Sequence, residues 1–379
     1  MTYKLMTAGP TQVAENVRLA RSKVTPNPDQ DPAFVEFYHE TCRRISRLMG
    51  SDAHETLILG GEGILALEAA IASITEPGDR ALVLDNGIYG AGFADFVRMY
   101  GGIPTLYTAD YRRSLDPSAL RAYLEAHHDF KYATLVHCDT PSGMLNDIAA
   151  LCPILKEFGI LTVVDSVSAM FAEPVDVTWG IDLLCGGSQK ALSAPPGLAF
   201  VTLSPDAKEA MEGRLSPVAS FYANLLAFRS YYEDKWFPYT MPASDIYGLA
   251  AALDNIEADL NFIPRHRELG HACREALISG GLVLYPQSGF SNTVSVFCVP
   301  EALTADAILR EMLTSHNIML GDSFGPFKGK LLRIGHMGEN CNREDIAQTL
   351  NALDQTLRQL GFTPSISLEG CFLSYADTI

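Results

Sequence analysis

The chain has 379 residues, of which 47% are hydrophobic and 19% charged, so it can form two domains and bury a sizeable core. Its formal net charge of −17 argues against nucleic acids and anionic membranes as partners. The first residues show no basic start with a long apolar run behind it, and no stretch of about 18 apolar residues occurs. We therefore expect neither a signal peptide nor a membrane span, and we take the cytoplasm as the default location.

The predicted elements change character along the chain. Residues 1–20 show few periodic apolar positions and predict an extended arm. Short apolar runs then alternate with helical patterns, with strands at 56–59, 81–85, 133–137, 161–165, 181–185 and 198–203 and helices at 64–74, 93–100 and 148–158. This alternation predicts an α/β fold with a mostly parallel, seven-stranded type of sheet and helices on both faces.

After about residue 245 the pattern indicates a smaller α+β domain. Helices are expected at 246–260, then, after an interruption at Pro264, up to about 278, and at 305–313 and 343–360, with strands at 293–297 and 330–334. We place the large cofactor-binding domain at 21–258 and the small C-terminal domain at 259–379. The eight cysteines form no CxxC pair, which favours buried, reduced thiols, and no ligand cluster with metal-binding spacing is present.

Four polar residues fall at the ends of predicted strands, where parallel sheets concentrate their chemistry: Asp85, His137, Asp165 and Lys190. A lone lysine is usually on the surface, but Lys190 lies between apolar strands and a Pro-Pro-Gly turn, which favours a buried amine that forms a Schiff base. Asp165 ends an apolar strand, so it is either a structural hydrogen-bonding group or the partner of a protonated pyridine nitrogen. We interpret His137, like His336, as a core histidine.

Two further residues have a functional and a structural interpretation. Tyr89 follows a strand and either packs in the core or stacks flat on a cofactor ring. Arg333 has apolar neighbours on both sides, which favours a buried anion such as a substrate carboxylate, and the alternative is an internal salt bridge.

Taken together, these residues resemble the class V aminotransferases of the alanine–glyoxylate and serine–pyruvate type, which are fold-type I pyridoxal-phosphate enzymes. The resemblance covers nearly the whole chain and is carried by the runs Thr7-Ala8-Gly9-Pro10-Thr11, Asn86-Gly87-Ile88-Tyr89-Gly90, Val164-Asp165-Ser166-Val167-Ser168, Ser188-Gln189-Lys190-Ala191-Leu192 and Arg333-Ile334-Gly335. It implies that pyridoxal 5′-phosphate is the cofactor and that an amino acid and a 2-oxo acid are the substrates.

The resemblance also assigns roles to residues. Lys190 is the Schiff-base lysine, Asp165 is the partner of the pyridinium nitrogen, and Tyr89 stacks on the ring. Arg333 binds the substrate carboxylate, together with Gly9 of the arm. The other implied cofactor contacts are Glu62, Gly63, Ile64, Thr140, Val167, Gln189 and Thr240. Thr240 matches a residue that reaches the neighbouring subunit's cofactor, so the resemblance implies a homodimer.

Three residues depart from the family's pattern. Glu62 and Ile64 stand where the phosphate-binding loop carries serine and histidine, and Phe237 stands where a tyrosine is usual. A carboxylate about 4 Å from a phosphate charge repels it by about 1 kcal/mol in water. These departures resemble the pyridoxamine–pyruvate aminotransferase branch, whose substrate is unphosphorylated pyridoxamine or pyridoxal, although residues 321–327 lack that branch's additional arginine. Alternatively, Glu62 turns toward the helix dipole or solvent, and backbone amides bind the phosphate.

Four functions follow from these observations. The leading one is an aminotransferase that moves an amino group between a small amino acid of the alanine or serine type and pyruvate or glyoxylate through a Schiff base on Lys190. The second is the pyridoxamine–pyruvate reaction, in which the pyridoxal compound is a substrate. The third is a lyase or decarboxylase on the same fold, and the fourth is a catalytically silent scaffold. The identity of the amino donor stays open.

Overall fold

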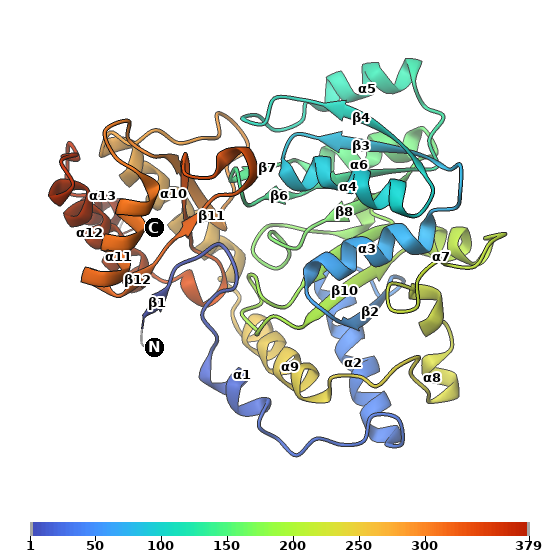
Figure 1. Cartoon of the computed structure of the whole chain (residues 1–379). Helices are drawn as coiled ribbons and strands as arrows, with labels where there is room; N and C mark the ends of the chain where they lie inside the picture. The colour runs from blue at the N-terminus through green and yellow to red at the C-terminus, as the bar shows by residue number, and fades with distance from the viewer. Residues whose placement is uncertain (1–2, 377–379) are drawn as a thin grey trace.

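The computed structural model describes residues 3–376 of the chain. It contains a seven-stranded sheet and a three-stranded sheet (Figure 1). The buried hydrophobic residues form two cores, and the three-stranded sheet contributes side chains to both. The second core draws its buried residues from the range 269–372 and, from the N-terminal arm, Met6. Helix α9 (Ala243–Ala258) ends and α10 (Phe262–Ser279) begins near residue 258, which supports the domain division that we propose there.

The large sheet has the strand order β2-β10-β9-β8-β5-β3-β4. Neighbouring strands from β9 to β4 are parallel, whereas β10 runs antiparallel to both β2 and β9. The bounds are β2 (Glu55–Gly60), β3 (Arg80–Asp85), β4 (Ile103–Thr108), β5 (Tyr132–Val136), β8 (Leu161–Asp165), β9 (Leu183–Gly187) and β10 (Leu198–Leu203). The predicted mostly parallel, seven-stranded α/β sheet is therefore confirmed.

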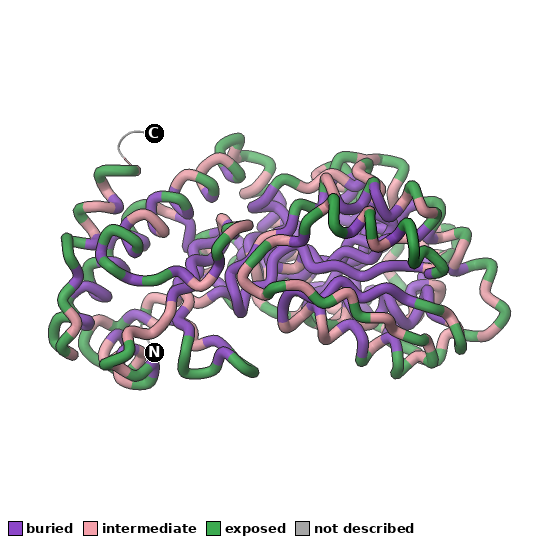
Figure 2. The backbone as a smooth tube through the Cα atoms, turned by 90° about the horizontal axis from the view of Figure 1, so that it is seen from above, coloured by how far each residue is buried: buried purple, intermediate pink, exposed green. Residues whose placement is uncertain are grey.

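Helices lie on both sides of this sheet, so the strands form a buried layer between two helical layers (Figure 2). They are α2 (Pro32–Leu48), α3 (Gly63–Ile74), α4 (Ile88–Met99), α5 (Pro117–Ala126), α6 (Ile148–Glu157), α7 (Pro205–Glu212) and α8 (Tyr231–Asp234). The start predicted for α4, at residue 93, was wrong, because Gly90 and Gly92 interrupt its apolar pattern and glycine is a poor helix former. Tyr89 therefore lies in the first turn of a helix.

The small domain contains the antiparallel sheet β11-β14-β13. Its elements are β11 (Val294–Cys298), α11 (Ala305–His316), β12 (Ile318–Met319), β13 (Gly321–Asp322), β14 (Leu331–Gly335), α12 (Arg343–Gln359) and α13 (Leu368–Ala376). Pro264 does not interrupt a helix as predicted, because it lies in the first turn of α10, where a backbone N–H is not needed. The prediction did not include α13.

The N-terminal arm connects the two domains (Figure 1). Strand β1 (Lys4–Leu5) pairs in parallel with β12, and the N–H of Gly335 donates to the carbonyl of Met6 at 2.9 Å. Further along, the Thr11 hydroxyl donates to the carbonyl of Lys190 at 3.2 Å, and the short helix α1 (Glu15–Ala20) follows. The arm is therefore held by the small domain at one end and by the Lys190 turn at the other.

No helix within residues 3–376 is both long and apolar enough to span a membrane. The eight cysteines are free, and all are buried except Cys298 and Cys371, which are half-buried. In the same part of the chain, no group of three or more histidine, cysteine, aspartate or glutamate side chains is arranged to hold a metal ion.

Candidate active site

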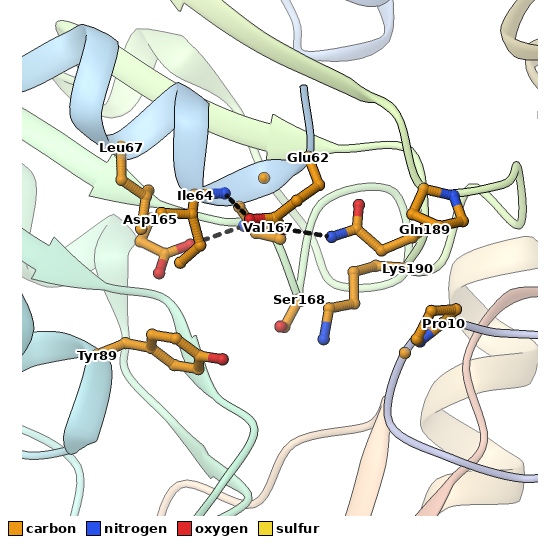
Figure 3. A pocket seen from close by; sticks show the side chains of 13 residues that line it. Pro10, Glu62, Ile64, Leu67, Tyr89, Asp165, Val167, Ser168, Gln189 and Lys190 are labelled. Carbon is orange, nitrogen blue, oxygen red and sulfur yellow. Dashed lines mark hydrogen bonds between the residues drawn. The ribbon is translucent and has the colours of Figure 1, made fainter. Parts of the chain in front are cut away.

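A cavity of about 310 Å³ lies at the carboxyl ends of β8 and β9 (Figure 3). It is lined by the arm, the N-terminal turns of α3 and α4, and the segments that follow the two strands. The lining residues are Gly9, Pro10, Glu62, Gly63, Ile64, Leu67, Tyr89, Asp165, Val167, Ser168, Gln189, Lys190 and Pro196. Asp165 and Lys190 thus face one cavity, as the positions of their strands predicted.

The Lys190 amine is held at the edge of this cavity. Its Nζ donates to the carbonyl of Ala8 at 2.6 Å. Burial, together with the nearby positive charge of Arg333, lowers the pKa of Lys190 to about 8. Gly9 has φ +97°, and a Cβ there would lie 2.5 Å from Cδ of Lys190, so only glycine lets the arm approach the amine this closely. The amine of Lys190 therefore loses its proton at a lower pH than an ordinary lysine does.

Asp165 is buried at the end of β8, with 5% of its surface exposed. Burial raises its pKa to about 7, although the N–H of Val167 donates to Oδ1 at 3.0 Å and the Lys190 charge favours ionisation. No salt bridge to Asp165 occurs among residues 3–376. A cationic ring nitrogen placed here would supply the charge partner that this buried carboxylate lacks.

Tyr89 projects into the cavity from the start of α4 (Figure 3). Burial and the neighbouring carboxylates of Asp165 and Asp139 raise its pKa to about 12, so its hydroxyl stays protonated. The ring of Phe324, which comes from the small domain, meets the Tyr89 ring edge-on with centroids 5.9 Å apart. Tyr89 is therefore placed to cover one face of a flat ligand.

Glu62 occupies the N-cap position of α3 and points toward the cavity (Figure 3). Its Oε1 accepts from the N–H of Ile64 at 3.2 Å, and its Oε2 accepts from Nε2 of Gln189 at 3.0 Å. The chain's own carboxylate thus lies at the helix N-terminus, where an external anion would otherwise bind. A Cβ at Gly63 would lie 2.7 Å from Cγ1 of Val167, so glycine permits the close contact between this turn and the cavity floor.

Two buried polar atoms in this region lack a hydrogen-bond partner among residues 3–376: Thr140 Oγ1 and Gln189 Oε1. Leaving a buried polar atom unpaired is costly, so a ligand in the cavity that donates a hydrogen bond to Gln189 Oε1 would be favoured. Among the lining residues, Asp165, Lys190 and Tyr89 offer a carboxylate, an amine and an aromatic ring, and these groups fit a pyridoxal ring. Thr140 does not itself line the cavity.

Arg333, on β14, lies beside the cavity rather than on its wall. Its Nε and Nη2 donate to the carbonyl of Asp322 at 3.0 and 2.5 Å, and Cζ is 5.6 Å from the centre of the Phe324 ring. Burial lowers its pKa, and Arg333 forms no salt bridge within residues 3–376. The internal ion pair considered as its alternative role therefore does not occur within residues 3–376, and the guanidinium bonds a backbone carbonyl instead.

Other predicted positions lie outside the cavity. Thr240 is exposed, and its hydroxyl donates to Asp29 at 2.8 Å. Phe237 is buried and stacks on Tyr231 with centroids 5.6 Å apart. Asp85 accepts from Tyr111, and the rings of His137 and His336 contact Ser166 and Ser295, respectively. Both histidines are buried with strongly lowered pKa values, in keeping with core roles.

The sequence did not identify several groups at the site. Phe324 carries no local pattern that points to a cavity, and Ala8 and Ser168 lie in runs that carry the family resemblance but were given no role of their own. Asp139 is buried, and its Oδ1 accepts from the backbone N–H of Tyr89 at 3.1 Å. It follows the predicted strand at 133–137 and begins the run Asp139-Thr140-Pro141-Ser142-Gly143, which resembles the pyridoxamine–pyruvate branch, but neither signal gave it a role.

Comparison with known proteins adds to this geometry. The sequence profile of the family described as "Aminotransferase class-V" matches residues 27–322. The chain belongs to the class V aminotransferases. It is thus a pyridoxal-phosphate-dependent transaminase, and the resemblance found in the sequence is confirmed.

Individual relatives of this class V aminotransferase match along most of their length. The pyridoxamine–pyruvate transaminase of Mesorhizobium japonicum is 31% identical over 364 residues, which are 94% of this chain and 92% of that protein. The serine–glyoxylate aminotransferase of Arabidopsis thaliana is 30% identical over 371 residues, or 95% and 91% of the two chains. The crystal structure of pyridoxamine–pyruvate aminotransferase from Mesorhizobium loti superposes with a TM-score of 0.92 at 28% identity and covers 99% of this chain and 97% of that one.

Proposed function

We propose that this class V aminotransferase moves an amino group between a small amino acid, such as alanine or serine, and a small 2-oxo acid, such as pyruvate or glyoxylate. The observation that carries the proposal is that Lys190, Asp165 and Tyr89 line one cavity, with Arg333 beside it. The names of the relatives, which refer to pyruvate, serine and glyoxylate, support this class of substrates.

Each residue has a role in this proposal. A bound pyridoxal compound supplies an aldehyde carbon and a ring that accepts electrons from the substrate. With such a compound bound, the neutral amine of Lys190 would hold it at the aldehyde carbon, and the same amine would move the proton at the substrate α carbon. Asp165 keeps the ring nitrogen protonated, and Arg333 binds the substrate carboxylate and so orients the bond that breaks.

The test combines an absorbance titration with product analysis. Wild-type protein titrated with pyridoxal or its phosphate should develop imine absorbance and transfer an amino group from alanine or serine to pyruvate or glyoxylate. Lys190→Ala should lose the imine absorbance, and its turnover should fall by at least about 10²- to 10⁴-fold. Lys156→Ala is the control, because Lys156 forms ion pairs with Asp182 and Asp206 and does not line the cavity. This variant should keep the imine absorbance and the turnover. Full turnover by Lys190→Ala, or release of ammonia or CO₂ in place of transfer, would refute the proposal.

A second candidate function is the pyridoxamine–pyruvate reaction, in which the pyridoxal compound is a substrate without a phosphate. The observation that favours it is the Glu62 carboxylate, which accepts from Ile64 N–H and from Gln189 at the N-terminus of α3. A phosphate at this position would meet a negative charge and a backbone amide that is already paired. This function predicts a protein that purifies colourless and binds pyridoxal more tightly than pyridoxal phosphate.

We also propose a homodimer in which Thr240 reaches the neighbouring active site. The segment that contains Thr240 carries apolar side chains that are largely exposed in the single chain: Leu215, Phe221, Tyr222 and Trp236 are 97%, 65%, 55% and 59% exposed. Exposed apolar side chains gathered in one segment are typical of an interaction surface. Thr240 itself is exposed and is not one of the residues that line the cavity of its own chain.

A further inference from the structure

Helix α4 begins without a side-chain cap of its own. Its N-cap residue is Gly87, which has no side chain to accept a hydrogen bond from the first free amides. The missing acceptor comes from elsewhere in the fold: Oδ1 of Asp139 accepts from the N–H of Tyr89 at 3.1 Å. The carboxylate lies 50 residues away in sequence and holds the turn that carries the tyrosine ring.

Asp139 is itself fixed in place. It ends β6 (Cys138–Asp139), which pairs with β7 (Met144–Leu145) in a short antiparallel hairpin. Its side chain is 1% exposed, and Oδ2 accepts from the Ser142 hydroxyl at 2.6 Å. The N–H groups of Ser142 and Gly143 donate to its carbonyl at 3.2 and 2.8 Å. The acceptor for Tyr89 is therefore part of a rigid turn.

The space around this contact admits no larger residue at position 87. A Cβ on Gly87 would lie 2.5 Å from Cγ of Asp139, although its φ of −179° suits any residue. Glycine is thus needed at position 87 for close approach, not for backbone conformation. One helical turn on, a Cβ on Gly90 would lie 2.8 Å from the carbonyl of Leu84, so the start of α4 is confined from two sides.

The surroundings of Asp139 act on its pKa in two directions. Burial raises its pKa, while the bonds from Ser142 and Tyr89 and the nearby Arg333 guanidinium favour the ionised form. A carboxylate at a helix N-terminus is stabilised by the helix dipole.

We propose that Asp139 is a positioning residue, which fixes the first turn of α4 so that the Tyr89 ring covers one face of the bound pyridoxal ring. Asp139 acts through Tyr89 and does not line the cavity itself. The inference rests on the proposed function, because it takes Tyr89 as the residue that stacks on the ring.

A double-mutant cycle on pyridoxal affinity tests the proposal. Asp139→Ala should weaken pyridoxal binding by about five- to ten-fold, the size expected for the loss of a helix N-cap. In a Tyr89→Ala background, the same change should add less than about two-fold, because the ring that it positions is gone. Asp139→Asn keeps an acceptor for Tyr89 and a group that bonds Ser142, and it should restore affinity to within about two-fold of wild type.

Asp182 offers a matched control, because it is another buried carboxylate, with its side chain 3% exposed, at the amino end of β9. Asp182→Ala should lower the melting temperature but leave pyridoxal affinity unchanged in both backgrounds. If Asp139→Ala does not fold, Gly87→Ala, which places a methyl group against Asp139, should weaken binding in its place.

Equal losses from Asp139→Ala with and without Tyr89, or wild-type affinity in both Asp139→Ala and Gly87→Ala, would overturn the positioning role while leaving the proposed function intact. A wild-type protein that binds neither pyridoxal nor its phosphate would instead refute the proposed function, and this inference with it.

Discussion

Glu62 provides the sharpest test of which pyridoxal compound this enzyme binds. Glu62→Gln keeps the shape of the side chain and one acceptor for Ile64 or Gln189, but it removes the negative charge at the N-terminus of α3. If this charge disfavours a phosphate, the change should raise the affinity for pyridoxal phosphate and leave the affinity for pyridoxal almost unaltered.

The size of the effect follows from Coulomb's law. Two unit charges about 4 Å apart interact by about 1 kcal/mol in water and by about 4 kcal/mol at an effective dielectric constant of about 20. Glu62 is exposed, so solvent screens its charge and the aqueous value applies. A phosphate monoester carries about 1.5 to 2 negative charges at neutral pH, which gives a penalty of about 1.5 to 2 kcal/mol. The ratio of the two affinities should therefore shift by about ten- to thirty-fold.

The assay is an absorbance titration of wild type and Glu62→Gln with each compound at fixed pH and ionic strength. The matched control is Glu68→Gln, which removes the same charge from α3 at a residue that bonds the Tyr100 hydroxyl and does not line the cavity. The control should not change the ratio. The reasoning would be refuted if wild type binds pyridoxal phosphate more tightly than pyridoxal and Glu62→Gln shows the same ratio of the two affinities. The carboxylate would then not oppose a phosphate.

Three further predictions follow from the site. Imine formation with pyridoxal should rise as pH passes through about 8, because Lys190 is a nucleophile only when neutral and its pKa is lowered; a midpoint near 10.5 in the absorbance-pH profile would contradict this. Arg333→Met should raise the KM for the 2-oxo acid by about ten- to hundred-fold, since a charge-assisted hydrogen bond contributes about 1.5–3 kcal/mol. The same variant should move the Lys190 midpoint to higher pH, because a neighbouring positive charge is lost. Phe221→Glu should yield monomers in light scattering, whereas Ile278→Glu, an equivalent change on α10, should not; dimers of both variants would place the interface elsewhere.

The two central residues of the site could be located from the sequence because their positions follow from strand order. Asp165 ends β8, and Lys190 follows β9, its parallel neighbour. The carboxyl ends of adjacent parallel strands lie at one edge of a sheet. Two polar residues that follow such strands therefore lie close together, independently of the conformation of the connecting loops. The apolar runs that identify these strands are local features, and they were visible without coordinates.

The resemblance to a family contributed roles that local patterns do not contain. The assignments of Arg333, Gly9 and Thr240 came from matching motifs, and the structure places Gly9 against Lys190 and Arg333 beside the cavity. Thr240 lies on the surface of the single chain, so its assignment depends on a second subunit and stays a prediction.

Only the tertiary structure decided how the cavity is closed. The contact of Glu62 with Gln189 joins residues 127 positions apart, and the contact of Lys190 with the Ala8 carbonyl joins residues 182 positions apart. Likewise, Phe324 reaches Tyr89 from the small domain. Periodicity reports which face of an element is buried but not which distant loop packs against it. The sequence therefore identified Glu62 as a departure at the phosphate-binding loop, but its contact with Gln189 depends on how distant segments pack and is seen only in the folded chain.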